Sequence, residues 1–207
     1  MGLYSRYIFP WIIDRVMARD LLVEERRKVL GAASGRVLEI GFGTGLNLPH
    51  YPAAVERLTV IDPSVGMHRR AAARIAASPL EIDAIAIGAD GQLPLDDNSF
   101  DYVVSTWTMC SIADIRRALA EVHRVLRPAG RLLFVEHGLS PESGVARWQN
   151  RLNGINKRIG EGCHLNRNIA ALLTASPLRL TDCDEFYLPS TPRIAGWTYR
   201  GAAEKTN

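Results

Sequence analysis

Two periodicities of apolar and polar positions alternate along the chain and predict alternating strands and helices. Short apolar runs with the length of buried strands lie at residues 37–40, 57–62, 80–87, 102–105 and 131–136. Between two of these runs, Met67, Ala71 and Ile75 recur every four residues and so share one face of a helix. This order of elements predicts an α/β, Rossmann-like fold whose sheet is mostly parallel and is covered by helices on both faces.

The two ends of the chain depart from this pattern. Strands predicted at Leu178 to Tyr187 and Ile194 to Arg200 are joined through a proline-bearing turn, so the final strand should be antiparallel. We expect residues 201–207 to form a polar tail and residues 1–30 to form a helical lead. That aromatic-rich lead is interpreted in three ways: as a lid over a binding site, as an amphipathic anchor on a membrane surface, or as a helix packed on the sheet.

Composition narrows the class of protein. Hydrophobic residues make up 47% and charged residues 23% of the 207 residues, which predicts one buried core and a single domain over residues 1–207. The net charge of +3 is too small, and the basic residues too scattered among acids, to indicate nucleic-acid binding.

Cysteine usage and hydropathy indicate a compartment. Cys110, Cys163 and Cys183 are odd in number and lack C-x-x-C spacing, so neither a disulfide framework nor a metal site is predicted. The apolar run from Tyr7 to Ile13 is shorter than the roughly 20 residues of a membrane span. We expect a cytoplasmic protein whose N-terminal segment is a candidate for peripheral membrane contact.

The chemistry begins at a glycine-rich turn, Gly41-Phe42-Gly43-Thr44-Gly45, which follows an apolar strand containing Glu39. Without Cβ atoms, backbone amides approach a ligand closely, and the amides of a strand-to-helix turn favour negative charge. A dinucleotide loop requires G-x-G-x-x-G, but here the third glycine comes one position early and Leu46 takes its place. The spacing therefore disfavours a nicotinamide-dependent oxidoreductase.

Acidic residues follow the next two strands. Asp62 ends the second strand, where a carboxylate can accept two hydrogen bonds from the hydroxyls of a ribose. Asp90 lies in the turn Gly88-Ala89-Asp90-Gly91 and suits an acceptor for an adenine amine. The loop from Thr106 to Cys110 follows the fourth strand, at the sheet edge where ligands of open α/β folds bind.

Together these stretches resemble the class I S-adenosylmethionine-dependent methyltransferases. The C-terminal half, with Glu136-His137 and the segment from Gly162 to Arg167, is similar to the microsomal alkyl thiol methyltransferases (the methyltransferase-like seven branch) and their bacterial relatives. The resemblance implies a seven-stranded sheet, S-adenosyl-L-methionine as cofactor and a small thiol acceptor. Bacterial chains of this kind also resemble phospholipid and quinone methyltransferases, so N-, O- or C-methylation of a lipid headgroup or quinone precursor is the alternative.

The resemblance also implies the roles of individual residues. Gly41, Gly43 and Gly45 would line the methionine portion of the cofactor, Asp62 would bind the ribose, and Asp90 the adenine amine. Phe42 departs from the family, where cysteine or another small residue is common. The full set of implied cofactor-binding residues is Glu39, Gly41, Phe42, Gly43, Gly45, Asn47, Asp62, Pro63, Met67, Ala89, Asp90, Gly91 and Thr106.

The acceptor side depends on fewer residues. His137 ends the fifth strand and either accepts a proton from the acceptor or orients the last loop. Arg167 either stabilises an anionic acceptor or caps backbone carbonyls. Substrate contacts are predicted for Tyr7, Trp11, Trp107 and His164, and a buried structural role for Cys110 and Cys163. Direct transfer to a thiol needs little or no dedicated base and no metal.

Overall fold

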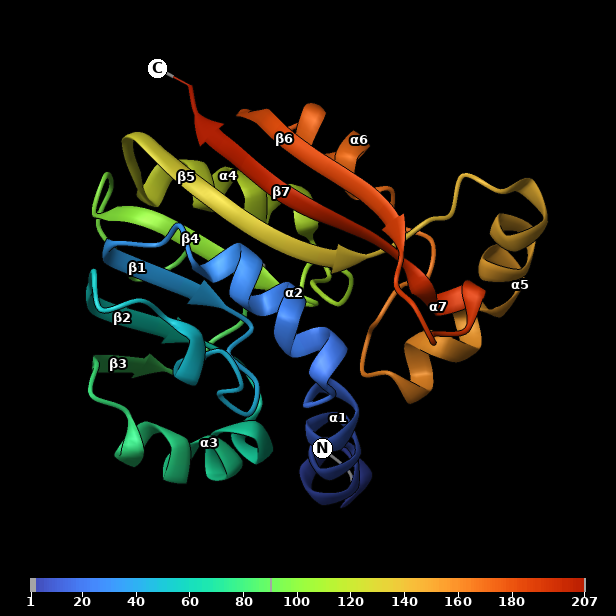
Figure 1. The fold of residues 1–207 in the computed structure, drawn as a ribbon, viewed down its shortest axis with the longest axis horizontal. Helices are drawn as coiled ribbons and strands as arrows, with labels where there is room; N and C mark the ends of the chain where they lie inside the picture. The colour runs from blue at the N-terminus through green and yellow to red at the C-terminus, as the bar shows by residue number, and fades with distance from the viewer. Residues whose placement is uncertain (1–2, 90, 207) are drawn as a thin grey trace.

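The computed structural model describes residues 3–89 and 91–206, and in that part of the chain seven strands form one sheet in the order β3-β2-β1-β4-β5-β7-β6 (Figure 1). Neighbouring strands are parallel except at β7, which is antiparallel to both β5 and β6. The predicted fold class is confirmed. The strands are β1 Gly35–Ile40, β2 Val55–Ile61, β3 Glu81–Ile85, β4 Phe100–Thr106, β5 Leu126–His137, β6 Leu178–Tyr187 and β7 Trp197–Lys205.

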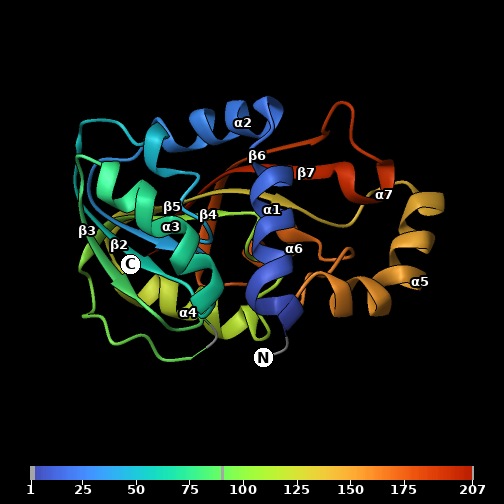
Figure 2. The same ribbon diagram turned by 90° about the horizontal axis from the view of Figure 1, so that it is seen from below.

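Helices cover both faces of this sheet. Figure 2 shows α2 and α4 on opposite sides of it, whereas α5 lies beyond one end. None of the helices in the described ranges is long and apolar enough to cross a membrane. The helices are η1 Tyr4–Ile8, α1 Phe9–Met17, α2 Asp20–Leu30, η2 Leu48–His50, α3 Val65–Ala77, α4 Ile115–Val125, α5 Ser143–Ile159, α6 Ile169–Thr174 and α7 Arg193–Gly196.

Each face of the sheet has its own apolar core. Val103 of β4 and Leu132 of β5 pack with the apolar stripe of α4, while their neighbours Val104 and Leu133 pack with the core that includes α2. Successive side chains of a strand point to opposite faces, so a strand buried on both faces is apolar at every position. This is why the central strands are continuous apolar runs in the sequence.

The C-terminal strand differs from its prediction at both ends. It begins at Trp197, because residues 193–196 form the short helix α7. It continues to Lys205, so the predicted tail at 201–207 is wrong for residues 201–205, which pair with β5 and β6. The polar residue Glu204 is accommodated there by ion pairs of 2.6 Å to Arg131 and 2.5 Å to Arg179.

Gly201 is required by the close approach of β6 and β7. A Cβ atom at Gly201 would lie 2.0 Å from the backbone oxygen of Asp182, next to a register shift in β6. Relief requires backbone movement, so we expect Gly201→Ala to lower the free energy of unfolding by about 2 kcal/mol or more. Gly154, in the middle of α5, meets no atom within 4 Å, and Gly154→Ala should instead raise it by about 0.5–1 kcal/mol.

Urea unfolding of the two variants beside the wild type tests this pair of expectations. Equal stabilities of Gly201→Ala and Gly154→Ala would contradict the close β6–β7 packing.

Candidate functional site

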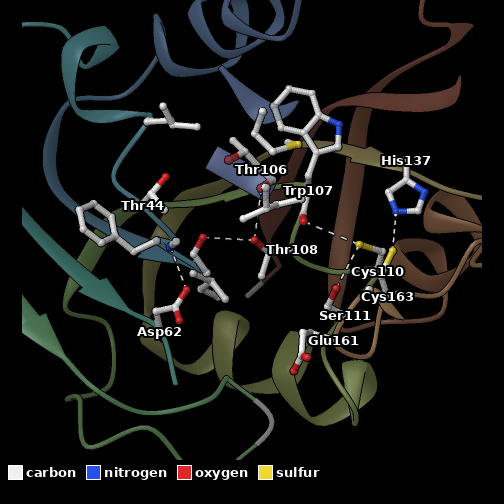
Figure 3. Close-up of a pocket in the computed structure, with 18 of the residues that line it drawn as sticks. Thr44, Asp62, Thr106, Trp107, Thr108, Cys110, Ser111, His137, Glu161 and Cys163 are labelled. Carbon is white, nitrogen blue, oxygen red and sulfur yellow. Dashed lines mark hydrogen bonds between the residues drawn. The ribbon is translucent and has the colours of Figure 1, made fainter. Parts of the chain in front are cut away.

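A cavity of about 740 Å³ opens at the carboxyl ends of β1, β2, β4 and β5. In the sheet β1 lies between β2 and β4, so the strand order reverses direction at β1. The cavity lies at this topological switch point, where ligands of open α/β sheets bind. Its volume lies within the roughly 300–1,000 Å³ of small-molecule sites. Figure 3 shows Thr44 and Asp62 on one side of it and Cys110, His137 and Cys163 on the other.

The glycine turn after β1 forms one wall through its backbone. Gly41 has φ +71°, and a Cβ there would lie 2.2 Å from the Thr108 side chain. Gly43 has φ +58°, lines the cavity, and its added Cβ would meet no atom closer than 3.9 Å. Gly41 thus permits loop packing, while Gly43 leaves the backbone open to a ligand. Gly45 lies behind Phe42 and is not part of the lining.

Asp62 joins two of the strand ends. Its Oδ2 accepts a 2.8 Å hydrogen bond from the Gly43 amide, and its Oδ1 accepts one of 2.8 Å from the Ser64 amide. The residue is buried. It lines the cavity together with the predicted residues Pro63 and Ala89. The carboxylate therefore fixes the glycine turn at the position where a ligand would meet it.

Three other predicted cofactor-binding residues are not seen at the cavity in the described part of the structure. Gly91 is absent from the cavity lining. Asp90 lies outside the described residues, and so does the side chain of Met67, although α3 contains its backbone.

A buried polar network lies beneath the turn. Glu39 accepts hydrogen bonds from Asn47 Nδ2 (2.9 Å) and from the Tyr51 hydroxyl (2.7 Å), and Asn47 also donates to Thr106 Oγ1 (3.1 Å). Burial raises the pKa of Glu39 to about 7, although the hydrogen bonds from Tyr51 and Asn47 oppose that rise. Asn47 Oδ1 is buried without a hydrogen-bond partner among the described residues. Since Asn47 lines the cavity, its amide oxygen is available to a donor on a ligand.

Helix α1 covers the cavity with one face. Phe9, Ile13 and Met17, spaced four residues apart, line it. Tyr7 and Trp11 point away, with 48% and 47% of their surface exposed, and do not line the cavity. The structure therefore does not bring Tyr7 and Trp11, the predicted substrate contacts, to the cavity, because helical periodicity turns them outward.

Asp14 ties α1 to the site. Its Oδ1 accepts hydrogen bonds from Thr44 Oγ1 (2.5 Å) and from Arg74 Nη1 (2.8 Å), and Arg74 also donates to the Thr44 carbonyl (2.7 Å). Burial alone would raise the pKa of Asp14, but the hydrogen bonds from Arg74 and Thr44 outweigh it and lower that pKa. Of the three interpretations of the N-terminal lead, this geometry favours the lid.

The far end of the cavity contains two thiols and an imidazole. His137 Nε2 lies 3.1 Å from Cys163 Sγ, and the ligand atoms of Cys110, His137 and Cys163 all lie within 4.8 Å of one another. A hydrogen bond with Cys110, together with burial, raises the pKa of Cys163 well above the usual thiol range. These residues line the cavity, so Cys110 and Cys163 face the site rather than only filling the core.

Arg167 and His164 hold the loop that carries Cys110. The Arg167 guanidinium donates to the carbonyls of Met109 and Ile112, the latter at 2.6 Å. The His164 amide donates to the Cys110 carbonyl at 2.9 Å. Neither residue lines the cavity, so the structure does not bring Arg167 and His164 to the place predicted for an acceptor. The alternative role of Arg167, capping backbone carbonyls, is the one its geometry supports.

Trp107 and Arg26 form a further wall. Trp107 lines the cavity as predicted, and the Arg26 guanidinium carbon lies 4.7 Å from the centre of its ring. Arg26 stands four residues from both Leu22 and Leu30, so helical spacing in α2 was a usable signal that it lies on the buried face. Cys110 follows β4 at the same sheet edge as His137, and that position was also a usable signal in the sequence.

The sequence profile of the family described as "Methyltransferase domain" matches residues 38–134. The chain is 35% identical over 173 residues to thiol S-methyltransferase TMT1B of Rattus norvegicus, covering 77% of this chain and 70% of that protein. It is 33% identical over 159 residues to a phosphatidylethanolamine N-methyltransferase of Cereibacter sphaeroides, covering 72% and 78%. A SAM-dependent methyltransferase structure from Aquifex aeolicus shares the fold, with a TM-score of 0.67, 17% identity and coverage of 95% and 97%.

The raised pKa of Glu39 predicts a pH dependence of stability. The folded protein retains the Glu39 proton up to about pH 7, whereas the unfolded chain loses it near the ordinary value of 4.5. Between these values the folded state binds more protons, so stability falls as pH rises. The charge of nearby Arg26 lowers the pKa of Glu39 and the charge of Asp62 raises it. The value of about 7 includes both effects.

We therefore expect the free energy of unfolding of Glu39→Gln to rise by about 3 kcal/mol relative to that of the wild type as the pH increases from about 4.5 to about 7.5. Chemical unfolding of both proteins across this range isolates the Glu39 contribution from that of other carboxylates. A difference in stability that does not change with pH would contradict the assigned protonation.

Proposed function

The chain belongs to the S-adenosylmethionine-dependent methyltransferases, and we propose that it transfers the cofactor's methyl group to a small thiol. One observation carries the proposal. A single cavity joins the glycine turn and Asp62 at one end to Cys110, His137 and Cys163 at the other. A methyl donor and an acceptor can therefore meet inside it. The relative named thiol S-methyltransferase supports a thiol as that acceptor.

The residues of the first end fit S-adenosyl-L-methionine, the cofactor of this family. Gly43 presents backbone with open space where a side chain would stand, which suits the methionine portion. Asp62 suits the ribose, because a carboxylate oxygen can accept more than one hydrogen bond. Asn47 Oδ1 is a buried acceptor that has no partner among the described residues. A ligand donor would remove the cost of burying that atom.

When bound, the cofactor supplies a methyl carbon on a sulfonium, which is transferred by in-line displacement. The task of the chain is to align the acceptor and to exclude water. Phe9, Ile13 and Met17 of α1 close the cavity with apolar side chains, and the Asp14–Arg74 ion pair of 2.8 Å holds that helix in place. A closed apolar site also suits an acceptor with a short alkyl chain.

A thiol acceptor makes modest demands on the protein. With a free pKa near 8.5, it is a few per cent thiolate at neutral pH, so no strongly basic residue is required. His137 lines the cavity and is suited to hydrogen-bond the acceptor or take its proton. The alternative is the amine of a phospholipid headgroup or the carbon or oxygen of a quinone precursor, and the phosphatidylethanolamine N-methyltransferase relative supports the headgroup amine.

An acceptor panel separates these two functions. Purified protein and methyl-labelled S-adenosylmethionine would be mixed in parallel with hydrogen sulfide, alkyl thiols, phosphatidylethanolamine liposomes and a quinol precursor. We expect labelled thioether from the soluble thiols. Label that appears only in the liposome or quinol reactions would replace the thiol proposal by its alternative. Cofactor binding without transfer to any of these acceptors would indicate a binding module instead of an enzyme.

Two substitutions test the division of the cavity into a cofactor end and an acceptor end. Asp62→Ala removes a charged hydrogen-bond acceptor, so we expect cofactor affinity to fall by about 10- to 100-fold. His137→Ala should leave that affinity unchanged and lower turnover. Calorimetric titration gives the affinities, and the thiol reaction gives the rates.

Asp62→Asn, which keeps one oxygen acceptor, is the matched control for loss of the Gly43 and Ser64 contacts. Equal cofactor affinity in Asp62→Ala and wild type would refute the ribose assignment. Equal turnover in His137→Ala and wild type would remove His137 from the acceptor site.

A further inference from the structure

Three metal-binding side chains converge at the acceptor end of the cavity. Cys110 comes from the loop after β4, His137 from the end of β5, and Cys163 from the loop after α5. Their ligand atoms lie within 4.8 Å of one another, and His137 Nε2 is 3.1 Å from Cys163 Sγ. Figure 3 shows both sulfur atoms next to the imidazole at the cavity wall.

We propose that Cys110, His137 and Cys163 bind a zinc ion whose fourth coordination position faces the cavity. Two thiolates and one imidazole form a ligand set that zinc accepts, and catalytic zinc sites have three protein ligands and one open position. Tetrahedral ligands at Zn–S of about 2.3 Å and Zn–N of about 2.1 Å lie roughly 3.6–3.8 Å apart. The observed spacing is therefore within about 1 Å of the required geometry.

The backbone segments that carry the two cysteines are fixed independently of any metal. Arg167 donates to the Met109 and Ile112 carbonyls on either side of Cys110, and the His164 amide donates to the Cys110 carbonyl itself. The Cys163 carbonyl accepts from Asn156 Nδ2 at 2.8 Å. Ligands held in place before the metal arrives lose little conformational entropy on binding it.

Contacts of Glu136, the residue before His137, fix the position of the third ligand. Glu136, which precedes His137, is fully buried and accepts hydrogen bonds from Ser105 Oγ (2.7 Å) and the Thr108 amide (3.0 Å). This ties the end of β5 to the loop after β4. His137 Nδ1 is buried and has no hydrogen-bond partner among the described residues. In zinc sites the second imidazole nitrogen commonly donates to a carboxylate, a carbonyl or a water molecule, and the described residues offer His137 Nδ1 neither of the first two.

The open position gives the metal a role, and this step rests on the proposed thiol function. With zinc bound, an acceptor thiol would release its proton to solvent and be held as a thiolate at the cavity end, and His137 would then act as a metal ligand and not as the proton acceptor. Its sulfur electron pair then forms the new bond to the methyl carbon, while the bond from that carbon to the sulfonium breaks. The products are a thioether and S-adenosylhomocysteine. Cys110 and Cys163 remain ligands throughout and are not methylated.

Metal binding can be measured without any transfer reaction. The protein would be reduced, stripped with a chelator, and titrated with cobalt(II) as a spectroscopic substitute for zinc, followed by zinc competition. We expect one metal per chain and a thiolate-to-cobalt charge-transfer absorption that zinc removes. Cys110→Ser and Cys163→Ser should each weaken binding by at least about 100-fold, since even residues behind the ligands contribute 10- to 100-fold.

Cys183 provides the matched control. It is the third thiol of the chain, lies in β6, and does not line the cavity. Cys183→Ser should bind the metal as the wild type does. Wild-type protein that binds cobalt no more tightly than Cys163→Ser would overturn the site. A second result would also overturn the site. In that case, protein purified without reductant contains a Cys110–Cys163 disulfide, and the same protein still fails to bind metal after the disulfide is reduced.

The two proposals fail in different ways. Methyl transfer to thiols that persists at full rate in chelator-stripped wild type would refute the role of zinc in transfer and leave the thiol function intact, while the cobalt titration decides whether the site binds metal. Stoichiometric metal binding, with its loss in Cys163→Ser and retention in Cys183→Ser, would support the site even if no thiol in the panel were methylated.

Discussion

The close packing of the loops after β1 and β4 is the constraint on which the site depends. A Cβ at Gly41 would lie 2.2 Å from Thr108, so only glycine lets the two loops meet. Thr108 in turn donates its amide to Glu136, which precedes His137 in β5. On the other side, the β1 loop continues to Gly43, whose amide binds Asp62 at the end of β2. The ends of β1, β2, β4 and β5 are thus joined by a chain of contacts that depends on the missing side chain of Gly41. The cavity forms where these strand ends meet.

This arrangement places buried charge beside the cavity, which costs stability. Glu39 and Glu136 are both buried at strand ends, and burial raises the pKa of each. Each accepts two hydrogen bonds from the chain, yet Glu136 Oε2 has no partner among the described residues, and neither has Asn47 Oδ1. Polar atoms left incompletely satisfied at one edge of an otherwise apolar core indicate that this edge is shaped for a ligand and not for maximal stability.

The sequence was sufficient for the fold class, and insufficient where long-range contacts decide. Apolar periodicity predicts the alternation of strands and helices, and the glycine turn and Asp62 are local signals at two strand ends. Tyr7 and Trp11 were assigned to the site for their aromatic character, and because α1 is apolar on both faces, spacing alone did not indicate which face lies over the cavity. The role of Arg167 depends on carbonyls 55 and 58 residues away, which no local pattern encodes.

The cysteines are a second case in which local sequence did not predict which residues lie close together. Sequence criteria for a metal site look for ligands close together along the chain, such as C-x-x-C, and by that criterion no metal site was predicted for Cys110, Cys163 and Cys183. In a parallel sheet, however, every carboxyl end reaches the same edge, so Cys110 after β4 lies near His137 at the end of β5, and the loop after α5 brings Cys163 within 3.1 Å of His137. The edge that brings Gly43 and Asp62 together also brings these three side chains to the same cavity. In this fold, position relative to a strand end is therefore a better guide to a shared site than spacing along the chain.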